Sequence, residues 1–231
     1  AVTYMYENAG SAVSQEIIDK TKAEYGLDKP FPVQYANWFA GMVTGDMGES
    51  YVSHRDVYET FTSKLPATIM LTLSSIILTV LLAVPLGILS AVKHNKWIDY
   101  VIRFLSFVGN SMPNFFAAMV LMYFLSVKLG ILPVVTNSDL GQSIILPTLT
   151  LAVSMAAKYT RQVRATVLEE LNKRYVQGAM ARGVSKRRIL LNHVLRNAWM
   201  PILTLSGIHF GVLLGGAAVV ESIFSWQGLG H

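Results

Sequence analysis

The sequence predicts an all-α protein that crosses a membrane several times, and three observations carry this prediction. The composition is 52% hydrophobic and only 14% charged, which is too apolar for an ordinary soluble domain. Four runs of 28, 24, 18 and 24 residues contain no Asp, Glu, Lys or Arg. The basic residues gather between some of these runs and are sparse between others. A soluble helical protein would rarely combine all three features.

The four charge-free runs are long enough to cross a bilayer as helices. A helix needs about 20 apolar residues to span about 30 Å of hydrocarbon, and it satisfies its own backbone polar groups. We therefore predict four transmembrane helices at residues 66–92, 104–127, 144–167 and 199–220.

Residues 1–65 precede the first predicted span and form a separate segment, whereas residues 66–231 form the transmembrane domain. The segment carries nine Asp and Glu against five Lys and Arg. Residues 14–25 predict a short surface helix. Residues 33–43 are amphipathic and aromatic, which suits either a helix lying at the membrane interface or a small packed cap.

The distribution of Lys and Arg predicts the orientation of the spans. Ten of the 19 lie between Lys158 and Arg196, and three more lie in the loop 93–103. These two segments should face the cytoplasm under the positive-inside tendency, while residues 1–65 and the loop 129–143 should face outside. An acidic external segment needs an upstream anchor, so we expect a further membrane helix before residue 1. By the same reasoning we expect another beyond His231.

Proline and glycine mark predicted bends and contacts within the spans. Pro85, Pro113 and Pro147 each remove a helical hydrogen bond and are expected to kink their helices. Three glycines spaced four apart predict a stripe for close helix contact, and they are Gly207, Gly211 and Gly215.

A polar group surrounds Pro113 within the second predicted span. Uncompensated amides are costly inside a membrane, so these side chains should face protein or water rather than lipid. They either line a translocation pathway or form hydrogen bonds between helices. The candidates are Asn110, Ser111, Pro113 and Asn114.

The sequence predicts no catalytic site, no metal site and no cofactor. It contains no cysteine, its histidines form no HExxH motif, and it lacks the GxxxxGK[ST] phosphate-binding loop. Ser206 and His209 lie three residues apart on one predicted helix, and a packing role for this serine is simpler than an intramembrane protease. The protein is therefore not predicted to be an enzyme.

The predicted cytoplasmic loop 168–198 is the segment that points to a partner. The third membrane helix should continue past the bilayer to a turn near residues 172–174. A short helix should follow and end at Gly183. A second amphipathic helix, with Ser185 as its N-cap, then carries Ile189 and Val194 on its apolar side.

This loop carries a cluster of small residues that is followed directly by a cluster of basic residues. The combination predicts a docking surface. A basic helix pair bound to anionic lipid would explain the arginines, but it would not explain the clustered glycine and alanine. The predicted docking residues are Gln177, Gly178, Ala179, Ala181, Arg182, Gly183, Lys186 and Arg187.

Residues 175–201 resemble the cytoplasmic coupling loop of ABC importer permeases, in which Glu-Ala-Ala is followed three residues later by Gly. Here Gln177 and Gly178 replace the glutamate and the first alanine, whereas Ala179 and Gly183 match. The run ARGVSKRRILLNHVLRNAWMPILT is similar to the peptide and nickel branch of that family. VVESIFSWQGLG and the segment from YGLDKP to IMLT are also similar to first permease subunits of this type.

The resemblance implies a fold of six membrane helices, of which this chain supplies the second to fifth, together with coupling helices. It also implies a multi-pass protein of the bacterial inner (cytoplasmic) membrane. The implied partners are a second homologous permease subunit, two ATPase subunits that hydrolyse ATP, and an extracytoplasmic solute-binding protein. The implied cargo is a dipeptide or oligopeptide, nickel, or a metallophore complex.

Two other functions remain open at this stage. An ATP-independent secondary transporter or channel would need charged groups inside the membrane for ion coupling, and the four runs supply none. A membrane scaffold would use the basic loop to recruit a soluble enzyme and would carry no solute.

Overall fold

The computed structural model describes residues 15–24, 26–50, 55–133 and 143–230. Within these ranges all regular secondary structure is helical, apart from one isolated bridge between Glu49 and Asp56. The chain divides into two compact units, residues 1–64 and 65–231, and each is described by itself. The all-α prediction is confirmed. Most of the predicted external loop 129–143, and His231, lie outside the described residues.

The first unit contains two predicted helices, α2 (Gln15–Glu24) and α3 (Phe31–Thr44). Helix α3 carries no Asp, Glu, Lys or Arg and contains no buried residue. Its aromatic side chains are open, with Phe31 76% and Trp38 58% exposed. Within the first unit, α3 therefore presents an uncovered aromatic surface, and both the interfacial helix and the packed cap stay predictions.

The long helix α4 (Val57–Val92) begins in the first unit and lies mostly in the second. It begins nine residues before the predicted start at residue 66, because a carboxylate oxygen of Asp56 accepts a 2.7 Å hydrogen bond from the N–H of Glu59 and satisfies a donor in the first turn. The helix then continues through both Pro66 and Pro85. Pro85 therefore does not end or divide this helix.

The second predicted span, residues 104–127, is sharply bent at Pro113, where a kink was predicted. Helix α5 (Trp97–Ser111) ends before Pro113, and α6 (Asn114–Met122) continues into the π-helical segment η1 (Tyr123–Lys128). The two parts meet at an angle of 104°. Proline disfavours a helical conformation in the residue before it, and Met112 is accordingly extended, with φ −82° and ψ 127°.

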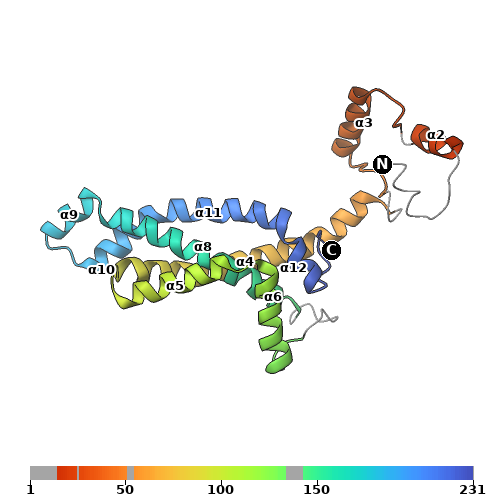
Figure 1. Cartoon of the computed structure of the whole chain (residues 1–231). Coiled ribbons are helices and arrows are strands. Elements are labelled where there is room, and N and C mark those ends of the chain that lie inside the picture. The colour runs from red at the N-terminus through yellow and green to blue at the C-terminus, as the bar shows by residue number, and fades with distance from the viewer. Residues whose placement is uncertain (1–14, 25, 51–54, 134–142, 231) are drawn as a thin grey trace. The chain divides into compact units, whose positions relative to one another are not determined.

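Helix α8 (Ile145–Leu171) is the centre of the second unit. It packs against α5, α6 and α11 (Figure 1), and it meets α4 where the hydroxyls of Ser74 and Thr148 lie 2.9 Å apart. Pro147 lies in its first turn, where no helical hydrogen bond is lost. The kink predicted at Pro147 is therefore absent.

The remaining helices follow the turn at the end of α8. They are α9 (Arg174–Ala181), α10 (Lys186–Ile189), the π-helical η2 (Leu190–Val194), α11 (Leu195–Gly216) and α12 (Ala218–Ile223). The fourth predicted span, 199–220, is thus divided after Gly216. A Cβ atom added to Gly207 or Gly211 would meet nothing within 4 Å, so these two glycines make no close helix contact within the described chain.

Two helices of the described residues are long and apolar enough to cross a membrane, Val57–Val92 and Lys186–Leu214. The bent pair formed by α5 with α6 and η1 would supply a third. Helix α8 covers the remaining predicted span, residues 144–167, and is more polar than the other spans. Several of its polar residues are covered by the neighbouring helices. Thr148, Thr150 and Thr160 are all buried in it. A helix enclosed by protein can carry such groups without facing lipid.

Candidate functional site

The predicted docking loop forms a tight turn between two long helices. Helix α8 ends at Leu171 with Asn172 as its C-cap, Lys173 adopts an extended conformation, and α9 begins at Arg174. Helix α10 starts after Ser185 and runs through η2 into α11 without a gap. The predicted turn at 172–174 is confirmed. Ser185 is the N-cap residue as predicted, although its side chain makes no capping hydrogen bond.

Gly183 ends α9 as predicted. Its φ of +78° lies in the left-handed region, which costs other residues about 1–2 kcal/mol. The N–H of Gly183 donates to the carbonyl of Met180 at 2.9 Å, and the N–H of Val184 donates to that of Ala179 at 3.1 Å. These bonds satisfy carbonyls at the end of α9. The glycine thereby sets the direction in which the basic residues of α10 leave the turn.

An apolar cluster fixes the loop to the membrane helices. Val176 and Ala179 of α9, Ile189 of α10 and Val194 of η2 are all at most 4% exposed. They pack with Ala91, Val163, Val167, Ala198 and Ile202 from α4, α8 and α11. Because these side chains form one buried cluster, α9 and α10 are packed closely against three long helices.

A buried carboxylate also holds the loop in place. Glu170 accepts a 2.7 Å hydrogen bond from the hydroxyl of Tyr175 and pairs with the ammonium group of Lys173. The amide of Asn197 donates to it from α11 at 3.4 Å. Burial alone would raise the pKa of Glu170, but the hydrogen bonds from Lys173, Tyr175 and Asn197 outweigh it and lower that pKa. The charged form of Glu170 therefore links α8, α9 and α11.

The structure separates the predicted docking residues into two groups. Gln177, Ala181, Arg182, Gly183, Lys186 and Arg187 are exposed, whereas Ala179 is 4% exposed. Ala179 packs in the apolar cluster and is covered within this chain, so its predicted contact with a partner stays a prediction. A Cβ atom added to Gly178 would lie 3.6 Å from a guanidinium nitrogen of Arg182, so that side chain lies beside the glycine.

A cavity of about 460 Å³ opens next to these residues, and the sequence did not suggest it. The exposed residues Lys186 and Arg187 stand on its wall together with Met180 of α9. Its other lining residues are apolar and come from the ends of α4 and α8 and the start of the helix after the turn, namely Val92, Leu171, Ile189 and Leu190. The docking surface thus combines a basic rim with an apolar recess.

The predicted pathway residues gather at the break between α5 and α6. Asn110 and Ser111 end the first helix, and Pro113 and Asn114 begin the second. The hydroxyl of Ser111 donates to the carbonyl of Phe107 at 2.9 Å. Ser111 and Asn114 are exposed, and Asn110 is half-buried. The structure brings these residues together, and whether they touch a solute stays a prediction.

Ser206 and His209 do not form a catalytic pair. The hydroxyl of Ser206 donates to the carbonyl of Ile202 at 3.0 Å, and Nδ1 of His209 lies 2.9 Å from the carbonyl oxygen of Leu205. Each polar group is therefore satisfied by its own helix.

Two buried carboxylates were missed by the sequence reasoning. Asp99 is fully buried and accepts two hydrogen bonds from Arg164, at 2.7 and 2.8 Å. Glu221 is 1% exposed and accepts bonds from the Thr68 hydroxyl at 2.8 Å and the Gly230 N–H at 2.7 Å. Asp99 is the sole acidic residue of the basic loop 93–103, which was a usable signal. Nothing in the local sequence pairs Glu221 with Thr68.

Comparison with known proteins identifies relatives along almost the whole chain. Residues 83–231 match the family described as "Binding-protein-dependent transport system inner membrane component". Residues 4–72 match the corresponding N-terminal family of such membrane components. The glutathione transport system permease protein GsiC of Salmonella choleraesuis is 40% identical over 223 residues. GsiC of Salmonella typhimurium is also 40% identical, and that of Escherichia coli K12 is 39% identical. Each alignment covers 96% of this chain and 72% of the relative.

Proposed function

We propose, from the premise that this chain belongs to the family of binding-protein-dependent transport system inner membrane components, that residues 174–190 dock an ATPase subunit. The family consists of ABC importer permeases, so the protein is an integral membrane transport subunit and not an enzyme. This membership favours an ATP-driven importer over a secondary transporter, a channel or a scaffold. The docking loop itself is our proposal.

One observation carries the docking proposal. The loop exposes Gln177, Arg182, Lys186 and Arg187 on one side, while Val176, Ala179 and Ile189 are buried against the long helices on the other. A surface that is open to a partner and rigidly joined to the membrane helices can transmit the partner's motion. ATP binding and hydrolysis would shift the permease between inward-open and outward-open states only if the ATPase contacts differ in those states.

The proposed assembly contains a second homologous permease, two ATPases and an extracytoplasmic solute-binding protein. We propose that the cargo is a peptide, because the aligned relatives are named as glutathione permeases. Nickel or a metallophore complex is a weaker candidate. No group of three or more His, Cys, Asp or Glu able to hold a metal ion occurs among the described residues. The polar residues at the α5–α6 break are the proposed contacts with the moving solute.

Substitution of Gly183 tests the docking loop. In the full-length permease co-expressed with its partners, Gly183→Trp should abolish co-purification of the ATPases and ATP-driven uptake. A Cβ atom at this position would meet nothing within 4 Å, so the indole would project from the turn and block the approach of a partner.

Gly130→Trp is the matched control. Gly130 also has a positive φ, +63°, and open space around its Cβ direction, but it lies in the predicted external loop. The control should keep its ATPases and its uptake because it carries the same backbone strain without touching the docking surface. Unchanged assembly and uptake in the Gly183 variant would refute the docking assignment.

A further inference from the structure

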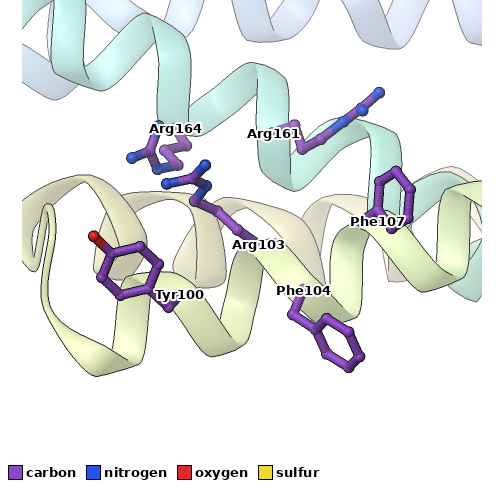
Figure 2. Close-up of a pocket in the computed structure, with 6 residues that line it drawn as sticks. All are labelled: Tyr100, Arg103, Phe104, Phe107, Arg161 and Arg164. Atoms are coloured by element: carbon purple, nitrogen blue, oxygen red, sulfur yellow. The ribbon is translucent and has the colours of Figure 1, made fainter.

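A second cavity lies between α5 and α8, outside the docking loop. It measures about 480 Å³ and is lined by Tyr100, Arg103, Phe104 and Phe107 of α5 and by Arg161 and Arg164 of α8. Figure 2 shows the side chain of Arg103 directed from α5 toward Arg164 on α8. Three guanidinium groups from two helices therefore line one groove.

The groove has more positive charge than its neighbours neutralise. Asp99 is joined to the groove through Arg164, and its two oxygens are already occupied. One oxygen accepts from Nε of Arg164 at 2.7 Å and from the Ser90 hydroxyl at 2.5 Å. The other accepts from a terminal nitrogen of Arg164 at 2.8 Å and from the Asn95 N–H at 3.0 Å. Asp99 is thus committed to Arg164.

The other two arginines are free to receive a ligand. Within the part of the chain that the structure describes, neither Arg103 nor Arg161 has an acidic partner within ion-pair distance. The guanidinium of Arg103 lies over the Tyr100 ring, 5.7 Å from its centre. Both side chains are exposed. The Asp99–Arg164 pair forms the back of the groove, while Arg103 reaches toward it from α5 and Arg161 extends away from it along α8 (Figure 2).

The geometry of these groups suits an oxyanion. Guanidinium groups present paired N–H donors that match carboxylate and phosphate oxygens. Two of them on different helices can hold one tetrahedral phosphate from both sides. Charge attraction would also offset the repulsion between Arg103 and Arg161 in the empty groove.

The walls indicate that this oxyanion carries an apolar body. Tyr100, Phe104 and Phe107 are 56%, 66% and 64% exposed, so the groove is bordered by open aromatic surface. The basic loop 93–103 is predicted to face the cytoplasm, which places the groove at the inner edge of the bilayer. Basic pockets between membrane helices at that level favour lipid headgroups.

We propose that this groove binds the phosphate of an anionic membrane lipid, with Arg103 and Arg161 as its ligands and Arg164 as the fixed rear wall. The lipid phosphate would bridge α5 and α8, and its chains would lie against Phe104 and Phe107. This site is independent of the proposed ATPase docking, because none of its residues belongs to the loop 168–198.

The test uses the full-length permease assembled with its partner subunits in nanodiscs. Discs of phosphatidylcholine are prepared with and without phosphatidylglycerol, and native mass spectrometry counts the phosphatidylglycerol that remains bound. Each arginine near a membrane surface contributes about 1 kcal/mol, so Arg161→Gln should weaken retention about fivefold. Arg103→Gln combined with Arg161→Gln should weaken it about thirtyfold.

Lys158→Gln is the matched control, since it removes one positive charge from an exposed position of α8 that does not line the groove. It should retain the lipid as the wild type does. If the double variant fails to assemble, Arg161→Gln alone is compared with Lys158→Gln. Equal retention by the wild type and the arginine variants would overturn the proposal. If an equal concentration of inorganic phosphate displaced the lipid, the site would be assigned to free phosphate and the proposal of a lipid site would be overturned.

Discussion

Glu170 shows how one side chain organises the docking loop. Its carboxylate is held by Lys173, Tyr175 and Asn197, which belong to the turn, to α9 and to α11. The hydrogen bonds lower its pKa, so the charged form is the one that stabilises the fold. The neighbouring Glu169 has a 75% exposed side chain and reaches only Lys173, at 3.9 Å. Two adjacent glutamates therefore differ in role because only one points into the structure.

Replacement of Glu170 by glutamine should destabilise the permease by about 1 kcal/mol, since an amide loses the charge-assisted bonds. The change is measured as a lower Tm of the purified protein, and Glu169→Gln should leave Tm unchanged. Because the pKa of Glu170 is lowered in the folded protein, its carboxylate stabilises the fold fully at pH values above 4.5, the ordinary glutamate pKa. This stabilisation is lost as the pH falls through the pKa of Glu170 in the folded protein. The Tm difference between wild type and Glu170→Gln should therefore shrink in acid. Equal Tm values for both variants at neutral pH would contradict this role.

The break between α5 and α6 lies at the proline where a kink was predicted, but the bend is sharp enough to divide the span into two helices. A charge-free run of 24 residues predicts one span, but Pro113 restricts Met112 to an extended conformation, and the chain turns through 104°. Pro85 has no such effect on α4. At Pro113 the chain instead forms two separate helices, and α5 and α6 each pack against α8.

Pro113→Ala should loosen this break, because alanine allows Met112 to become helical. The chain contains no cysteine, so spin labels can be placed at Val101 on α5 and Met119 on α6, which are 45% and 50% exposed. Distances from pulsed electron paramagnetic resonance should broaden toward longer values. Pro85→Ala in the same labelled protein should not change them. An unchanged distribution in Pro113→Ala would mean that packing against α8 sets the bend without the proline.

At the scale of the whole second unit, close contact between α4 and α8 decides which glycines matter. A Cβ atom at Gly87 would lie 2.7 Å from the Cβ of Val163 and 2.9 Å from the carbonyl oxygen of Thr160. The predicted stripe lies elsewhere, and at Gly207 and Gly211 it is open within this chain. Spacing along one helix predicts a surface for close approach, but it does not identify the helix that approaches.

Gly87→Ala should therefore destabilise the protein by roughly 1–3 kcal/mol through overpacking. Gly211→Ala should be neutral or stabilising by up to about 1 kcal/mol, because alanine is the better helix former. Thermal unfolding of the two single variants compares them directly. The contact between α4 and α8 would be disproved if both substitutions raised Tm equally.

The sequence by itself determined the features that depend on residues close together in the chain. Charge-free runs and basic loops predict the helices and their orientation, and Gly183 ends α9 because its conformation is a local requirement. The tertiary structure decided which sides of these helices are covered by other helices. Ala179 turns inward, α8 is enclosed, and Arg164 meets Asp99 from 65 residues away. Such contacts join distant parts of the chain, so no local pattern of residues encodes them.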